Sequence, residues 1–396
     1  MRPLHYYLLG TGSWFLSVGI QGVMFAWLVT MVLRESPDRV GIAQMTLLLP
    51  GTLFILAGGS VADRYGGRRV AALAQATATL APLWLLALVL TDQLTFAGLL
   101  AYALVMGCAQ AFVTPARDGL LNTIADGRIQ RTVMLASIAQ FGTSILGFLI
   151  ASTADAVGPA LILGIQVLIL AVGVAGFHRI AQPRRALSNE SRATLMASVI
   201  EGAKTVVQHR QLRMVALQNV AMSLFFMGSY IVTLPLLVRE AFNGTATDLG
   251  LMNVCNSIGL VLAISLLLRR GDVTRQGRAL ILAQFVGAIV LGAVALAPGF
   301  TAFLGMVFVW GACGGVAMTM SRTIMQEQAP DGQQGRVMGF HSFSFMGAGP
   351  LGALGSGYLV DQLGAQAALG ISATGMLAVV LMIGFRSALW HMKAAP

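Results

Sequence analysis

The chain has few charged residues and few cysteines, and each shortage excludes a class of protein. Only 10% of its 396 residues are charged, whereas a water-soluble domain carries about 25%. The three cysteines, Cys108, Cys255 and Cys313, lie apart within apolar runs and form no Cys-x-x-Cys or Cys/His spacing. A soluble globular protein, a disulfide framework and a cysteine-based metal site are therefore excluded, and we expect no metal or cofactor.

Catalytic groupings are lacking as well. The five histidines are scattered along the chain, and none of the 15 acidic residues lies in the middle of a long apolar stretch. An integral membrane enzyme would need a buried Ser/His, metal or carboxylate constellation. We therefore expect a protein that is not an enzyme.

The net charge of +10 comes from 25 Lys and Arg against 15 acids. A soluble nucleic-acid binder gathers such charge into exposed patches, whereas here the basic residues are scattered between long uncharged runs. No nucleic-acid partner is expected, and a lipid bilayer accounts for both the charge pattern and the 57% hydrophobic content.

Long uncharged stretches are what the sequence has in abundance. Ten stretches of 20 to 31 residues contain no Asp, Glu, Lys or Arg, and an eleventh, residues 279–321, is interrupted by Ala297-Pro298-Gly299. About 20 apolar residues span a bilayer, and a Pro-Gly turn ends a helix. Because helices satisfy the backbone in lipid and no strand alternation is present, we predict an all-α integral membrane protein with twelve transmembrane helices.

The basic residues also predict an orientation. If the N-terminus is cytoplasmic, all Lys and Arg residues fall in inner segments except Arg34, Arg39 and Arg239. The positive-inside rule then puts both termini in the cytoplasm. We expect a multi-pass protein of the plasma membrane, which in a bacterium is the inner membrane.

The longest polar segment divides the predicted spans into two groups of six. We expect an N-terminal six-helix bundle over residues 1–178 and a C-terminal six-helix bundle over residues 214–396. Residues 179–213 would form a cytoplasmic linker, whose second part has the amphipathic pattern of a helix at the membrane surface, with a plain linker as the alternative.

An internal repeat supports two related halves. At an offset of 205 residues, eight of the 32 positions in residues 116–147 and 321–352 are identical, among them Arg117/Arg322. Two pseudo-symmetric bundles around a central site are a transporter architecture, because rigid bundles can rock about that site.

A motif follows the second predicted span: Gly58-Gly59-Ser60-Val61-Ala62-Asp63-Arg64-Tyr65-Gly66-Gly67-Arg68-Arg69. It resembles the Gly-x-x-x-Asp-Arg-x-Gly-Arg-Arg/Lys loop of the major facilitator superfamily. The matching positions are Gly59, Asp63, Arg64, Gly66, Arg68 and Arg69, and a degraded second copy runs from Asp272 to Arg278. The resemblance implies the major facilitator fold and an inner gate motif.

Physical reasons can be given for the motif. Gly59 would let another helix approach closely, and Asp63 would lie at the positive N-terminus of the eleventh span, near Arg336. The alternative is an arginine anchor that only follows the positive-inside rule.

Four further segments narrow the resemblance to the branch of enterobactin exporters and macrolide efflux proteins. They are Pro50, Pro115-Ala116-Arg117, residues 234–240 and residues 326–338. This branch implies an exporter of amphiphilic small molecules, a siderophore or a drug, that works by alternating access as an antiporter coupled to proton entry. In the eleventh span, Gly349, Pro350 and Gly352 resemble the glycine-rich helix bend of antiporters.

Charged residues at the inner helix ends form a second group of candidates. They are Arg117, Asp118, Arg322, Glu327 and Arg336. Asp118 and Glu327, together with Asp63, are the candidates for proton exchange, and the three arginines are their expected ion-pair partners. The alternative for each is a structural ion pair or helix cap.

Polar and aromatic residues within the spans predict a substrate cavity. Gln21 and Met24 lie in the first span, and the seventh carries Asn219, Ser223, Phe226 and Tyr230 at helical spacing. Asn256 and Trp310 could join them from the eighth and tenth spans. Hydrogen bonding between helices is the competing explanation for the polar members.

Other functions were compared with export. A major facilitator importer, a lipid transporter or a uniporter shares the gate motif, so the direction of transport stays open. A channel or a receptor could share the helix count but would account for neither the repeat nor the motif. A channel and an integral membrane enzyme stay as remote alternatives. We expect a monomer that binds a small-molecule substrate.

Overall fold

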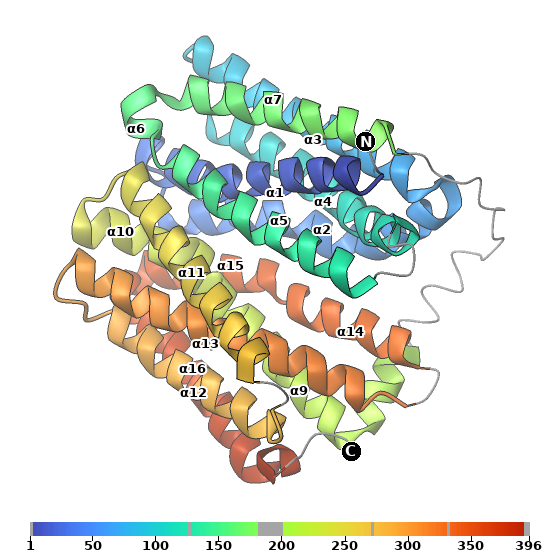
Figure 1. Cartoon of the computed structure of the whole chain (residues 1–396). Coiled ribbons are helices and arrows are strands. Elements are labelled where there is room, and N and C mark those ends of the chain that lie inside the picture. Colours follow the sequence, from blue (N-terminus) through green and yellow to red (C-terminus); the bar gives the residue numbers. More distant parts are fainter. Residues whose placement is uncertain (1–2, 125–128, 181–200, 271–272, 331–332, 392–396) are drawn as a thin grey trace. The chain divides into compact units, whose positions relative to one another are not determined.

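The computed structural model describes residues 3–124, 129–180, 201–270, 273–330 and 333–391. Within these ranges every regular element is a helix (Figure 1). The chain forms two compact units, which are described one at a time.

The first unit comprises Met1–Glu35, Thr46–Leu195 and Gly244–Leu251. Its helices are α1 (Pro3–Trp27), the π-helical η1 (Leu28–Val32), most of α2 (Pro37–Tyr65), α3 (Gly67–Leu90), α4 (Phe96–Ile124), α5 (Ile129–Ala151), α6 (Ala154–Val157) and α7 (Pro159–His178). Helix α1 packs on α5 and α7, and α3 packs on α4 and α7.

The second unit comprises Ser36–Met45, Met196–Asn243 and Met252–Pro396. Its helices are α9 (Arg210–Ala221), the π-helical η2 (Met222–Met227) and η3 (Ser229–Thr233), α10 (Leu234–Phe242), most of α11 (Ala246–Arg270), α12 (Gln276–Val294), α13 (Phe300–Glu327), α14 (Gln334–Met346), α15 (Gly349–Leu363), α16 (Ala365–Arg386) and η4 (Ala388–His391). Helix α12 packs on α13 and α16, and α15 packs on α16.

Two helices pass from one unit to the other. The first turns of α2 belong to the second unit and its remainder to the first, whereas α11 begins in the first unit and continues in the second. The boundaries of these two units differ from those of the two predicted bundles. The division into bundles over residues 1–178 and 214–396 stays a prediction. Of the predicted linker, residues 181–200 lie outside the described residues, and residues 201–208 are helical.

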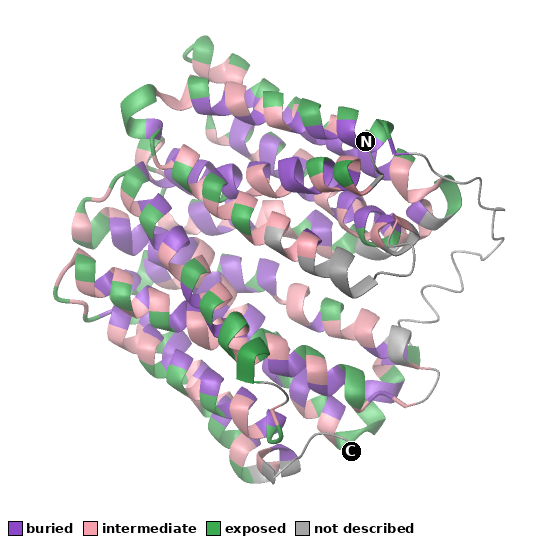
Figure 2. Cartoon of the chain, viewed as in Figure 1, coloured by how far each residue is buried: buried purple, intermediate pink, exposed green. Residues whose placement is uncertain are grey.

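The side chains are distributed as a lipid solvent requires. Gln75, Gln166 and Gln284 are fully buried, whereas Leu73 and Leu168 are 66% and 65% exposed. Figure 2 shows buried and exposed residues alternating along the same helices. Apolar surface of this extent is costly in water and favourable against acyl chains.

Among the described residues, nine helices are long and apolar enough to cross a membrane. The segment from α9 to α10 counts as one of them, and α5 has only a shorter apolar stretch, Leu135–Ala151. The predicted all-helical membrane fold is confirmed, while the count of twelve stays a prediction. The predicted eleventh span is divided into α14 and α15.

Candidate functional site

In the first unit, hydrogen bonds between buried side chains join α1, α3 and α7. The Gln75 side-chain amide donates to Ser13 Oγ at 3.0 Å and to the Leu170 carbonyl at 3.1 Å. Gln166 Nε2 donates to Ser17 Oγ at 3.1 Å. Each bond joins two helices, as interhelical hydrogen bonds do in membranes.

The predicted cavity residues of α1 lie one or two turns beyond these serines. Gln21 is 5% exposed and Met24 is 1% exposed. Nearby, Phe25 stacks on Tyr102, with ring centroids 5.8 Å apart. Both side chains are therefore buried.

In the second unit, three predicted cavity residues come together. The Trp310 ring of α13 lies 5.5 Å from the Phe226 ring and 5.8 Å from the Tyr230 ring, measured between centroids. Phe226 belongs to η2 and Tyr230 to η3. The Tyr230 hydroxyl donates to Asn253 Oδ1 of α11 at 2.6 Å. We call Phe226, Tyr230 and Trp310 the aromatic cluster.

Asn219 is bonded to two further helices. Its Oδ1 accepts from Ser321 Oγ of α13 at 2.6 Å, and its Nδ2 donates to Ser344 Oγ of α14 at 3.3 Å. Ser321 Oγ also lies 3.2 Å from His341 Nε2. Because the serine proton is given to Asn219, the histidine donates from Nε2. This group, the Asn219 network, joins α9, α13 and α14.

The two remaining cavity candidates of the second unit behave differently. Ser223 is buried, and its hydroxyl has no hydrogen-bond partner among the described residues. Asn256 is partly exposed. Its backbone carbonyl oxygen lies against Gly311 of α13, and a Cβ on Gly311 would overlap that oxygen. Asn253, one turn earlier, is the asparagine that meets the aromatic cluster.

At the predicted inner ends, Arg117 of α4 is an unusual buried cation. It is 7% exposed, and its guanidinium lies over the Phe15 ring at 4.6 Å. Its Nη2 pairs with the exposed carboxylate of Asp118 at 3.0 Å. Its Nη1 has no partner among the described residues. A cation–π contact and one ion pair offset part of the cost of burying this charge.

The gate motif forms the turn between α2 and α3. Gly66 has φ +90° and precedes the first residue of α3, so a side chain there would be strained. The Arg64 guanidinium lies 5.4 Å from the Tyr65 ring centroid. Arg68 Nη1 donates to the Ile180 carbonyl at 3.0 Å. Arg69 is exposed. The side chains of Asp63 and Arg336 lie outside the described residues, so their expected contact stays a prediction.

The structure distinguishes the two adjacent glycines of the gate motif, and the role expected of Gly59 stays a prediction. A Cβ on Gly59 would come no closer than 3.9 Å to Pro115, an ordinary contact. A Cβ on Gly58, by contrast, would overlap the Ala111 carbonyl oxygen of α4. Successive helical residues are rotated by about 100°, so the residue that faces α4 is Gly58.

The other inner candidates lie in the second unit. Glu327 accepts both hydrogen bonds of its neighbour Gln276 Nε2 at 3.1 Å. The Arg278 guanidinium lies 4.9 Å from the Trp390 ring. Arg322 is exposed, and Asp272 lies outside the described residues. Within the described part, no three His, Cys, Asp or Glu side chains gather as metal ligands.

The predicted helix bend coincides with a break in the helix. Helix α14 ends at Met346, and α15 begins at Gly349, with Pro350 in its first turn. A Cβ on Gly352 would meet the Ser223 carbonyl oxygen at 2.9 Å, and one on Gly228 would overlap the Gly352 carbonyl. Glycine at both positions therefore lets η2 and α15 cross at backbone contact.

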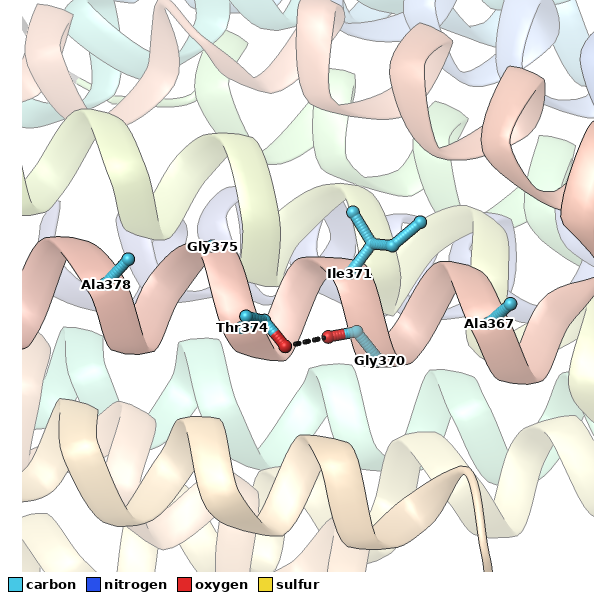
Figure 3. Close-up of a pocket in the computed structure, with 6 residues that line it drawn as sticks. All are labelled: Ala367, Gly370, Ile371, Thr374, Gly375 and Ala378. Carbon is cyan, nitrogen blue, oxygen red and sulfur yellow. Dashed lines mark hydrogen bonds between the residues drawn. The ribbon is translucent and has the colours of Figure 1, made fainter.

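A shallow groove of about 500 Å³ lies along α16. It is lined by Ala367, Gly370, Ile371, Thr374, Gly375 and Ala378 (Figure 3). The Thr374 hydroxyl donates to the Gly370 carbonyl at 2.8 Å, as Figure 3 shows, so its polar group is satisfied within the helix. This groove contains none of the predicted site residues.

Comparison with known families decides the family. The model of the transmembrane secretion effector family, a major facilitator group, matches residues 8–396. The chain belongs to this family. It is a transporter and not an enzyme.

One curated relative of this transporter is the "Multidrug efflux pump Tap" of Mycolicibacterium fortuitum. It is 26% identical over 366 residues, which cover 88% of this chain and 87% of the relative. This similarity supports the predicted superfamily and a relation to efflux proteins.

Solved major facilitator structures share the fold. The nucleoside transporter NupG matches with a TM-score of 0.77 at 14% identity over 98% of this chain and 100% of that chain. A POT family transporter in complex with 5-aminolevulinic acid matches with a TM-score of 0.77 at 13% identity, covering 97% and 96%. At these identities the likeness concerns the fold alone.

Sequence reasoning missed two features of this transporter's interior. The histidines are scattered along the sequence and indicate no grouping, whereas the His341 ring is bonded to Ser321 within the Asn219 network. Gly58 was passed over in favour of Gly59. The spacing of Ser321 and His341 around the predicted spans ten and eleven could have indicated the first, but no sequence signal distinguishes adjacent glycines.

Proposed function

We propose that the chain is a secondary active exporter of amphiphilic small molecules, such as a siderophore or a drug, that works by alternating access. The observation that carries the proposal is the match to a multidrug efflux pump at 26% identity along nearly the whole chain.

The chemistry of the predicted cavity residues fits an amphiphile. Aromatic rings and uncharged amides or hydroxyls supply both apolar surface and hydrogen bonds, as small-molecule sites do. The spans that carry Phe226, Tyr230, Trp310 and Asn253 contain no charged residue over 214–238, 249–268 and 300–321. A densely charged solute such as a sugar phosphate would find no counterion there.

The inner gate of this exporter would be the motif around Asp63 together with the buried Arg117. This guanidinium is buried, has one exposed carboxylate partner, and has no partner at Nη1 among the described residues. Such a group is stabilised by a second anion when helices rearrange. The protein would act as a monomer in the bacterial inner membrane, with both termini in the cytoplasm. Arg34, Arg39 and Arg239 would lie on the outer side, and the 22 other Lys and Arg residues would lie on the cytoplasmic side.

Proton entry would drive export. The acidic candidates are Asp63, Asp118 and Glu327 at the inner ends, and His341 joins them as an ionisable side chain within a buried hydrogen-bond network. A proton taken up by His341 would require a second acceptor at Nδ1, so it would change how α14 is held against α13.

The proposal can be tested with purified protein in liposomes and rhodamine 6G as the amphiphilic probe. An imposed pH gradient should drive uphill movement of the probe, and nigericin, which collapses the gradient, should abolish it. Protein-free liposomes provide the baseline. Probe flux that ignores the pH gradient would refute proton coupling, and uphill flux in the direction of proton movement would refute export.

A further inference from the structure

The aromatic cluster keeps one hydrogen-bond donor unused. Trp310 is 7% exposed, and its indole N–H has no partner among the described residues. Tyr230, in contrast, gives its hydroxyl proton to Asn253 at 2.6 Å. An unpaired buried donor destabilises a protein, so such a group points to a role in binding when other observations agree.

The other two rings of the aromatic cluster lie at an angle to the Trp310 ring. The Phe226 ring meets the Trp310 ring edge to face at an interplanar angle of 73°, and the Tyr230 ring is tilted by 48° to it. Both partners come from one helical segment, whereas Trp310 comes from α13. Rings at such angles present faces and edges on which a further planar ring can stack.

The helical segment that carries Phe226 and Tyr230 is irregular. Phe226 lies in the π-helical η2, and Tyr230 lies in the π-helical η3. The hydroxyls of Ser223, Ser229 and Thr233 in these two stretches also have no partner among the described residues. π-helical turns are rare and occur frequently at functional sites.

The aromatic cluster also lies near the middle of the predicted spans. At 1.5 Å per residue, Trp310 is about 15 Å from the first residue of α13, and Tyr230 is about 18 Å from the last residue of α10. Half of a hydrocarbon core is about 15 Å. The donor is therefore near the middle of the spans, where transporters bind their substrates.

We propose that Phe226, Tyr230 and Trp310 bind an uncharged planar aromatic part of the transported solute, and that the Trp310 N–H donates a hydrogen bond to a carbonyl-type acceptor on that part. The absence of charged residues from 214–238, 249–268 and 300–321, the spans of the aromatic cluster and of Asn253, fits an uncharged group. This inference rests on the proposed transport of amphiphiles and names their recognised part.

A matched pair of probes tests the inference. Radiolabelled 9-fluorenone has a carbonyl acceptor and fluorene lacks it, while the planar ring systems are alike. Binding to the whole chain in nanodiscs is measured by equilibrium dialysis, with empty nanodiscs subtracted. We expect the wild-type protein to prefer fluorenone roughly tenfold, as one added hydrogen bond predicts.

Variants locate the donor. Trp310→Phe keeps a ring and removes the N–H, so the preference should fall to about one while fluorene binding stays. Phe226→Leu should weaken both probes alike. Trp84→Phe, at a half-exposed tryptophan of α3, is the control and should change neither.

Each outcome decides the inference. It is overturned if wild-type protein binds neither probe, if it binds both equally, or if Trp310→Phe keeps the tenfold preference. The wild-type comparison needs no variant, so a Trp310→Phe protein that fails to fold leaves the test in place. Binding does not depend on export, so a failure of proton-driven efflux with an intact fluorenone preference would count against the proposed function alone.

Discussion

The indole N–H of Trp27, the last residue of α1, donates to Asp155 Oδ1 at 3.0 Å. The other carboxylate oxygen of Asp155 accepts from the backbone N of Ala246, the first residue of α11, at 2.5 Å. A carboxylate at a helix N-terminus is favourable because it meets unpaired N–H groups and the positive end of the dipole. Within the first unit, one side chain thus holds the predicted outer ends of three helices.

Asp155→Ala should therefore destabilise the first unit. It removes two hydrogen bonds and the charge at the start of α11, for which we expect about 1–2 kcal/mol and a fall of a few degrees in Tm. Asp155→Asn keeps an acceptor and loses the charge, so its Tm should lie between the other two. Thermal unfolding in detergent measures this. Asp361→Ala, where the carboxylate accepts from its neighbour Gln362, is the control; equal Tm values for Asp155→Ala and wild type would contradict the assignment.

The two glycines of the gate motif should respond differently to alanine. Gly58→Ala puts a methyl group into the Ala111 carbonyl, and backbone atoms cannot move aside cheaply, so we expect about 1–3 kcal/mol of destabilisation and impaired transport. Gly59→Ala meets only an ordinary contact with Pro115 and should be tolerated. Membrane abundance, thermal stability and probe flux of the two variants check the order, and the reverse order would show that the predicted role of Gly59 is right.

This pair of glycines also shows how far sequence reasoning reaches. Charge-free runs predict helices in lipid because a charge at a bilayer centre is expensive, and this physics needs no tertiary structure. Helical spacing likewise predicts that Phe226 and Tyr230 share a face, and Trp310 does meet both. Which of two adjacent glycines faces α4 depends on the rotation of α2 about its axis, which packing determines.

The same limit applies to the asparagines of α11. Asn253 and Asn256 lie about one turn apart, and the seventh span could have met either. In the structure, Asn253 is the asparagine that accepts a hydrogen bond from Tyr230. Tyr230 lies in a π-helical stretch, and π-helical turns change the direction in which the following side chains point. The break before Gly349 was predictable in place from the glycines and Pro350, but the close crossing of Gly228 and Gly352 was not.

A second close crossing lies within the second unit, where the first turns of α2 meet α15. A Cβ on Gly357 would come within 2.6 Å of the Pro37 carbonyl oxygen and 2.8 Å of Gly41 Cα. Gly357→Ala should therefore weaken the hold on the start of α2 by about 1–3 kcal/mol. Gly355→Ala is a matched control two residues away, since its Cβ would have open space. Thermal stability should fall for the first variant alone, and limited proteolysis near Ser36 should become faster; equal behaviour of the two variants would contradict the crossing.

The Asn219 network should behave as one unit when its members are removed. Ser321→Ala leaves Asn219 Oδ1 without its donor and removes the contact to His341, and we expect about 1–3 kcal/mol of destabilisation. Asn219→Ala removes the same bond from the other side, so the double variant should be less destabilised than the sum of the two single variants. Ser342→Ala, at an exposed serine of α14, is the control and should unfold like the wild type. Unfolding free energies in detergent give the coupling, and additive effects of the two substitutions would mean that the hydrogen bond between α9 and α13 contributes nothing to stability.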